Sequence, residues 1–237
     1  VIVHQRLSVP VCAQSNVSIY GVVDAYMGFG SHGDNDFAGV QDGALSGSRL
    51  GFRGTEDLGN GLKGVFTFEQ GFAVDTGTGM GGPSRQSFVG LAGSFGAVTL
   101  GRQYAPGWDF QYDALVGSVV SPQYILASGV GSSIVANSAT RWNNSVAYNG
   151  MFSGLKVRAI YSMAANENTT LVDGEYTEPS DDDAMGLGLE YTNGALTVGA
   201  VYQMLQTASK AAAADDQTEW LLGGHYNFGV ATLSVSY

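Results

Sequence analysis

One stretch of the chain decides the fold class: Leu155-Lys156-Val157-Arg158-Ala159-Ile160-Tyr161-Ser162-Met163. Leu, Val, Ala, Tyr and Met alternate along one face of this stretch, and Lys, Arg and Ser lie on the other. Alternation over eight or more residues has the period of a β-strand, whose successive side chains point to opposite faces, and it fits helical spacing poorly. The stretch is therefore predicted to be a strand with one apolar and one polar face.

About eleven segments share this alternation, near residues 17–29, 47–55, 62–71, 85–92, 97–104, 138–149, 155–163, 184–192, 196–205, 218–227 and 230–237. Tight turns such as 56–61 alternate between them with long polar loops such as 30–46 and 105–137. Short turns at one end of a sheet and long loops at the other are typical of outer-membrane barrels. The sequence thus predicts an all-β fold, a transmembrane antiparallel β-barrel.

The composition excludes several other classes of protein. Aromatic residues make up 11% of the 237 residues and charged residues only 13%, which is the reverse of a disordered chain. A net charge of −11 argues against a nucleic-acid partner. The single cysteine and three scattered histidines, His4, His32 and His225, do not suit a metal site. We therefore expect no metal, no cofactor and no nucleic acid.

Enzyme motifs are weak in this sequence. Residues 59–64, Gly-Asn-Gly-Leu-Lys-Gly, match a dinucleotide-binding pattern, but a strand follows where the pattern needs a helix. The nucleophile elbow Gly-x-Ser-x-Gly does not occur. We expect that the protein is not an enzyme.

The basic residues concentrate in the predicted strands, whereas the acids concentrate in the loops. The strands hold eight of the 10 basic residues and four of the 21 acids: Arg49, Arg53, Lys63, Arg85, Arg102, Arg141, Lys156 and Arg158, with Asp24, Glu69, Glu190 and Glu219. Because a basic residue facing lipid at mid-membrane costs about 2–4 kcal/mol, these side chains are expected to line a lumen. Arg102 shares the alternation of Val98 and Leu100, so either a bulge at Gly101 re-aims it or its face packs against a neighbouring subunit.

Five segments resemble the general diffusion porins of Gram-negative outer membranes, particularly the β-proteobacterial type: VSIYGVVDA (17–25), SGSRLGFRGTEDLG (46–59), GLKGVFTFE (61–69), RQSFVGL (85–91) and GAVTLGRQY (96–104). Beyond residue 104 the match is looser. The resemblance implies a homotrimer of sixteen-stranded, water-filled barrels in which the third long loop, 105–137, folds inward and constricts the pore.

The resemblance also implies which residues meet at the constriction. An arginine ladder on the wall would consist of Arg49, Arg102 and Arg141, and it would face Asp109 and Asp113, the only acids of the loop. Both acids lie at the start of the loop, which departs from the family pattern. Seven further charged residues of the strands could line the pore: Asp24, Arg53, Lys63, Glu69, Arg85, Lys156 and Arg158.

The function implied is passive diffusion of small hydrophilic solutes and ions across the outer membrane of a Gram-negative bacterium. Outer-membrane lipid and lipopolysaccharide would surround the barrel. The alternatives are a non-conducting structural barrel or adhesin that displays acidic loops, and a soluble β-sandwich that binds a ligand.

The ends of the chain carry separate expectations. Residues 1–13 resemble the remnant of a signal peptide, with small residues before Gln14. Residues 14–237 would then form the barrel, incomplete at its C-terminus, because single-chain barrels have an even strand number. A small complete barrel of twelve strands that ends at Tyr237 is the rival interpretation.

Overall fold

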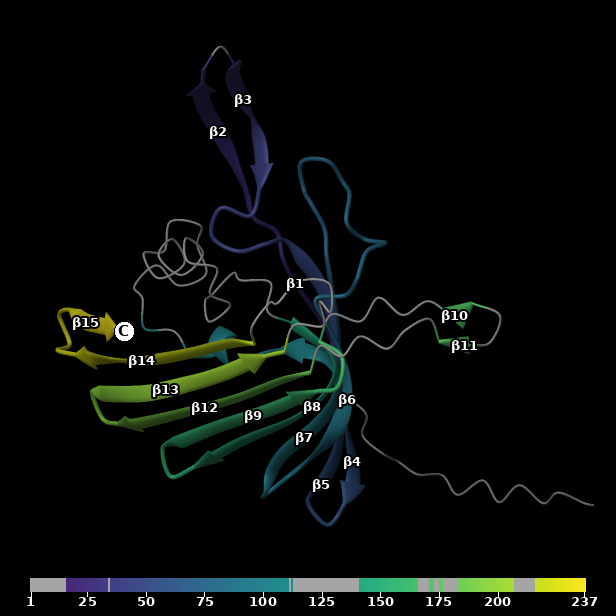
Figure 1. Cartoon of the computed structure of the whole chain (residues 1–237), viewed down its shortest axis with the longest axis vertical. Helices are drawn as coiled ribbons and strands as arrows, with labels where there is room; N and C mark the ends of the chain where they lie inside the picture. The colour runs from purple at the N-terminus through teal and green to yellow at the C-terminus, as the bar shows by residue number, and fades with distance from the viewer. Residues whose placement is uncertain are drawn as a thin grey trace, which may run out of the picture.

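The computed structural model describes residues 16–33, 35–110, 112, 141–165, 171–172, 175–176, 183–206 and 216–237. Eleven strands form one antiparallel sheet in chain order: β1 (Asn16–Val22), β4 (Arg49–Gly59), β5 (Leu62–Gly71), β6 (Gln86–Gly93), β7 (Gly96–Tyr104), β8 (Arg141–Phe152), β9 (Leu155–Ser162), β12 (Ala184–Asn193), β13 (Leu196–Leu205), β14 (Gln217–Asn227) and β15 (Thr232–Ser236). The sheet is strongly curved (Figure 1). The prediction of about eleven strands is confirmed for this sheet, and four further strands lie outside it.

Two short hairpins lie outside this sheet: β2 (Ala25–His32) with β3 (Asn35–Asp42), and β10 (Leu171–Val172) with β11 (Glu175–Tyr176). The β2–β3 hairpin stands away from the sheet (Figure 1), so the prediction of one strand over 17–29 and a loop over 30–46 is wrong. The chain leaves the sheet after Val22, and the Gly43 amide donates to the Asp24 carbonyl at 2.9 Å across the base of the hairpin. Strand β2 has the same two-residue period as β1, and periodicity does not reveal a change of partner.

The short connections β4–β5, β6–β7, β8–β9, β12–β13 and β14–β15 all lie at one end of the sheet. Two of them, Asn60-Gly61 and Ser153-Gly154, have positive φ at both central residues. This is the type I′ geometry, whose twist matches that of the flanking strands. The predicted sorting of connections by length is therefore confirmed for the described strands.

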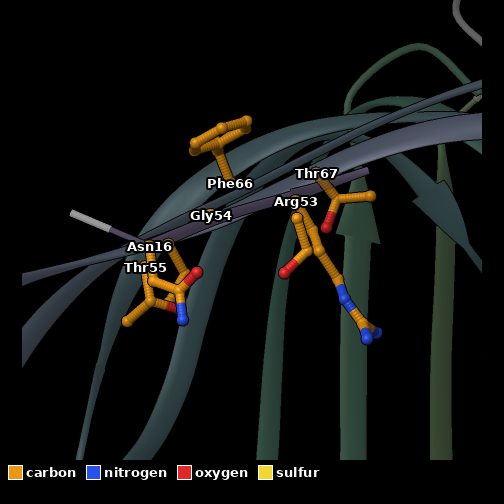
Figure 2. Close-up of a pocket in the computed structure, with 8 residues that line it drawn as sticks. Asn16, Arg53, Gly54, Thr55, Phe66 and Thr67 are labelled. Carbon is orange, nitrogen blue, oxygen red and sulfur yellow. The ribbon is translucent and has the colours of Figure 1, made fainter. Parts of the chain in front are cut away.

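The two faces of the sheet differ in chemistry. Along β12, Met185, Leu187 and Leu189 are each about 40% exposed and alternate with Gly186 and Gly188, which are buried. Figure 2 shows the same division at the first strands, where Arg53 and Thr67 point to one side of the sheet and Phe66 to the other. We call the apolar, exposed face the outer face and the opposite face the inner face.

The inner face is partly covered by the segment that follows β7. This segment contains the 3-10 turn η1 (Pro106–Trp108) and continues to Phe110 and Tyr112, both buried against Val201 and Leu221. Strands β1 and β15 are the edges of the sheet and do not pair with each other within the described residues. The strand number of a closed barrel therefore stays a prediction. Among the described residues, no helix is long and apolar enough to cross a membrane.

Candidate functional site

The inner face carries an arginine cluster around one buried acid, Glu69, which is 4% exposed. Its Oε1 accepts a hydrogen bond from Arg85 Nε at 2.8 Å, and its Oε2 lies 3.7 Å from Arg49 Nε. The Tyr20 hydroxyl donates to Glu69 Oε2 at 3.0 Å. Arg53 lies beside this group, with its guanidinium 5.2 Å from the Tyr20 ring centroid. One carboxylate thus binds two arginines, and a third lies beside the tyrosine that donates to it.

Tyr104 extends the cluster toward β8. Its hydroxyl accepts hydrogen bonds from Arg85 NH2 and Arg141 NH2, both at 2.8 Å. The Arg141 guanidinium also lies 4.5 Å from the centroid of the Tyr104 ring. Trp108 of η1 stacks on the Tyr104 ring, with the two ring centroids 4.2 Å apart and an interplanar angle of 7°. The arginine cluster (Arg49, Arg85 and Arg141 with Glu69, Tyr20 and Tyr104) is therefore linked directly to the inward segment.

Arg102 is placed differently from the other two predicted ladder residues. It lies opposite Ser87 of β6, two residues after Leu100, which lies opposite Val89. Its Nε donates to the Ser84 carbonyl at 2.6 Å. Its NH1 donates to Asn143 Oδ1 at 2.5 Å. The β7–β8 register shifts between Gly101 and Gln103, but the extra residue lies in β8, where Asn143 and Asn144 stand opposite Arg102 alone. Strand β7 stays in register with β6 through Arg102, so the expected bulge at Gly101 that would re-aim this side chain is not found. The structure brings Arg49 and Arg141 to one cluster but binds Arg102 to the Ser84 carbonyl and the Asn143 side chain.

The remaining predicted pore residues are scattered. Asp24 lies between β1 and β2, where its Oδ2 accepts the amides of Leu45 and Ser46, both at 2.8 Å. Those two backbone donors hold the pKa of Asp24 below its usual range. Lys63 is exposed near the short-turn end of β5. Asp113 lies outside the described residues.

Asp109 pairs with β9. Its Oδ2 lies 3.0 Å from Arg158 NH1, and its carbonyl accepts a hydrogen bond from Lys156 Nζ at 3.0 Å. Lys156 Nζ also lies 4.5 Å from the centroid of the Phe110 ring. Arg158 NH2 donates to the Tyr104 carbonyl. The loop acid that was expected to face the arginine ladder is bound to a different basic pair.

The sequence did not single out the aromatic and amide side chains that complete these contacts: Tyr20, Tyr104, Tyr112 and Gln203. Tyr112 donates to Glu190 Oε2 at 3.0 Å, and Gln203 Oε1 accepts the Gly107 amide at 2.7 Å. Each strand residue among them lies at an inner-face or strand-end position. Alternation in the sequence could therefore have predicted that its side chain faces inward, but not which residue it contacts. In the described ranges, no group of three His, Cys, Asp or Glu side chains is arranged to hold a metal ion.

Comparison with known proteins matches nearly the whole chain to one family. A family model described as Gram-negative porin covers residues 6–237. Outer membrane porin protein 32 of Delftia acidovorans is 34% identical over 94% of this chain and 63% of its own length. An outer membrane porin of Bordetella pertussis is 30% identical over 95% of this chain and 64% of its own.

Solved structures agree with this result. A structure titled as an anion-selective porin from Comamonas acidovorans has a TM-score of 0.74 and 29% sequence identity, and the match covers 94% of this chain and 67% of that one. Salmonella typhi OmpF has a TM-score of 0.62 at 15% identity, which is a likeness of fold. The chain spans just under two thirds of the length of the Delftia and Bordetella relatives.

Proposed function

Because the chain belongs to the Gram-negative porin family, we propose that the protein forms a passive, water-filled channel for small hydrophilic solutes and ions. The family places it in the outer membrane of a Gram-negative bacterium and is not a family of enzymes. One observation carries the proposal: the outer face of the curved sheet is apolar, and its inner face holds the arginine cluster. An apolar exterior suits lipid, and a charged interior suits a water column.

The channel is proposed to prefer anions. Four arginines lie at or near the arginine cluster, and Glu69 is the acid that hydrogen-bonds within it: Arg49 and Arg53 of β4, Arg85 directly before β6, and Arg141 of β8. Rings of like charge in a pore raise the local concentration of counter-ions and repel co-ions. The solved relative from Comamonas is itself titled as anion-selective.

The proposed assembly is a homotrimer, as the family resemblance implies, surrounded by outer-membrane lipid and lipopolysaccharide. The exposed apolar residues of the outer face are compatible with either lipid or a neighbouring subunit. Native mass spectrometry of the full-length protein in detergent tests the subunit number. The proposal predicts three, and a monomer would contradict it.

Ion preference is tested by single-channel recording in planar bilayers under a salt gradient. The double variant Arg49→Gln, Arg141→Gln of the full-length protein is expected to shift the reversal potential toward that of a cation-preferring pore. Lys63→Gln is a single-charge control: Lys63 lies near the short-turn end of β5, six residues along the strand from Glu69, so its loss should shift the reversal potential less. An unchanged reversal potential in the double variant would refute the role of the cluster. A wild-type protein without open-channel steps would instead favour the structural barrel or adhesin.

A further inference from the structure

The segment 105–112 lies on the inner face in a regular way. Strand register places three consecutive rows of inner-face residues beneath it: Ile160–Gly186–Gln203, Arg158–Gly188–Val201–Leu221, and Lys156–Glu190–Gly199–Gly223. Pro106 lies against the first row, Phe110 against the second and Tyr112 against the third. The rows succeed one another along the strands, and the contacts also move from Gly186 of β12 to Gly223 of β14, so the segment runs obliquely along the wall.

Glycines make room for the segment at each row. A Cβ on Gly186 would lie 2.8 Å from Pro106 Cδ, and one on Gly188 would lie 2.7 Å from Phe110 Cζ. A Cβ on Gly223 would lie 2.8 Å from Tyr112 Cγ. Carbon atoms in ordinary contact are about 3.5–4.0 Å apart, so any side chain at these positions would push the segment off the wall by about 1 Å or more.

Charged side chains tie the segment down at the second and third rows. The Arg158 side chain is only 11% exposed, and its guanidinium binds Asp109 Oδ2, the Tyr104 carbonyl and Asn149 Oδ1. Lys156 binds the Asp109 carbonyl and lies over the Phe110 ring. Both donors point at the segment: the Arg158 charge is paired with the Asp109 carboxylate, and Lys156 has Glu190 as its cross-strand neighbour.

The end of the described segment is held by Glu190. It accepts the hydrogen bond of the Tyr112 hydroxyl at 3.0 Å. Burial and the neighbouring Glu190 carboxylate raise the pKa of Tyr112. Glu190 and Lys156 are cross-strand neighbours, which brings the two ties together on the third row.

We propose that Lys156, Arg158 and Glu190, with the glycines of the three rows, are positioning residues that seat segment 105–112 and set the free cross-section of the channel. The preference of the channel for anions over cations would depend on the arginine cluster instead. The inference rests on the proposed channel function. It separates two quantities that a channel recording measures independently: the conductance, which follows the cross-section, and the reversal potential, which follows the fixed charge exposed to the lumen.

The first experiment alters the glycines beneath the segment without changing any charge. Gly188→Ala and Gly223→Ala act on different rows and displace Phe110 and Tyr112, respectively, into the lumen. Each full-length variant that folds is expected to lose single-channel conductance, and the uptake of a large neutral sugar into proteoliposomes is expected to fall more than the conductance. Gly64→Ala is the control, because its new Cβ would have no neighbour closer than 3.8 Å.

The second experiment separates positioning from a direct charge effect. Lys156→Gln is expected to change the conductance and leave the reversal potential at the wild-type value, and Lys156→Arg is expected to restore the conductance. A reversal-potential shift in Lys156→Gln as large as that of the arginine-cluster variant would overturn the inference, as would glycine variants that conduct like Gly64→Ala. These results are distinct from a failure of the proposed function, in which the wild-type protein would not conduct.

Discussion

Replacing Glu69 with Gln removes the one carboxylate of the arginine cluster while keeping its shape. With an effective dielectric constant of about 20, two unit charges attract by about 6 kcal/mol at the 2.8 Å of the Arg85 contact and by about 4 kcal/mol at the 3.7 Å of the Arg49 contact. Desolvation offsets much of this attraction, because the three side chains are between 6% and 20% exposed.

The net effect of Glu69→Gln is expected to be a loss of about 3 kcal/mol in the free energy of unfolding, the lower end for breaking a buried ion pair. Gln keeps one oxygen that can accept from Tyr20 or Arg85, and water in the lumen screens the arginines left behind. Both effects place the loss at that lower end.

The assay is equilibrium unfolding of the full-length protein in guanidinium chloride with detergent micelles, followed by the loss of β-sheet circular dichroism. Glu56→Gln is the control, since Glu56 is an exposed carboxylate of β4, and its loss should stay within about 0.5 kcal/mol. The reversal potential of Glu69→Gln should also move further toward anions. A variant as stable as Glu56→Gln, with wild-type selectivity, would refute the structural reasoning for the cluster.

Two further predictions concern single hydrogen-bonding groups. Gln203→Leu leaves the buried Gly107 amide without its acceptor and should cost about 1–3 kcal/mol in the same unfolding assay; a variant as stable as the wild type would argue against the bond. Because its folded pKa is lowered, Asp24 stabilises the base of the β2–β3 hairpin fully at neutral pH, and this contribution should fade as the pH drops below about 4. The protection factors of the Leu45 and Ser46 amides, which are measured relative to the intrinsic exchange rate at each pH, should therefore fall in acid in the wild type, and this acid dependence should be lost in Asp24→Asn.

The sheet was predictable because each of its strands carries its own signal. Alternation needs only the local sequence, and turns such as Asn60-Gly61 mark where a hairpin reverses. The β2–β3 hairpin was missed because alternation continues past Val22 although the partner strand changes. The backbone ties at Asp24 that cause this change depend on residues about 20 positions away.

The charged residues of the wall were predictable as a set, but their partners were not. Placing Arg49, Arg85 and Arg141 in strands follows closely from the sequence, although Arg85 directly precedes β6. Their convergence on Glu69 and Tyr104 depends on long side chains reaching across strands at the end of the sheet, where the β7–β8 bulge alters the spacing. Local patterns do not contain this information.

The glycine-lined recess under segment 105–112 could be predicted from the sequence only in part. The two-residue turn between Asn193 and Leu196 fixes the β12–β13 register, so the neighbours Glu190 and Gly199 follow from counting back from that turn. The next neighbour in the row, Gly223, lies beyond the long connection between β13 and β14, whose length imposes no register. An inward glycine next to Glu190 could therefore be deduced from the sequence. The three-row recess that receives Phe110 and Tyr112 required the paired strands themselves, because its shape is a property of register across a long loop.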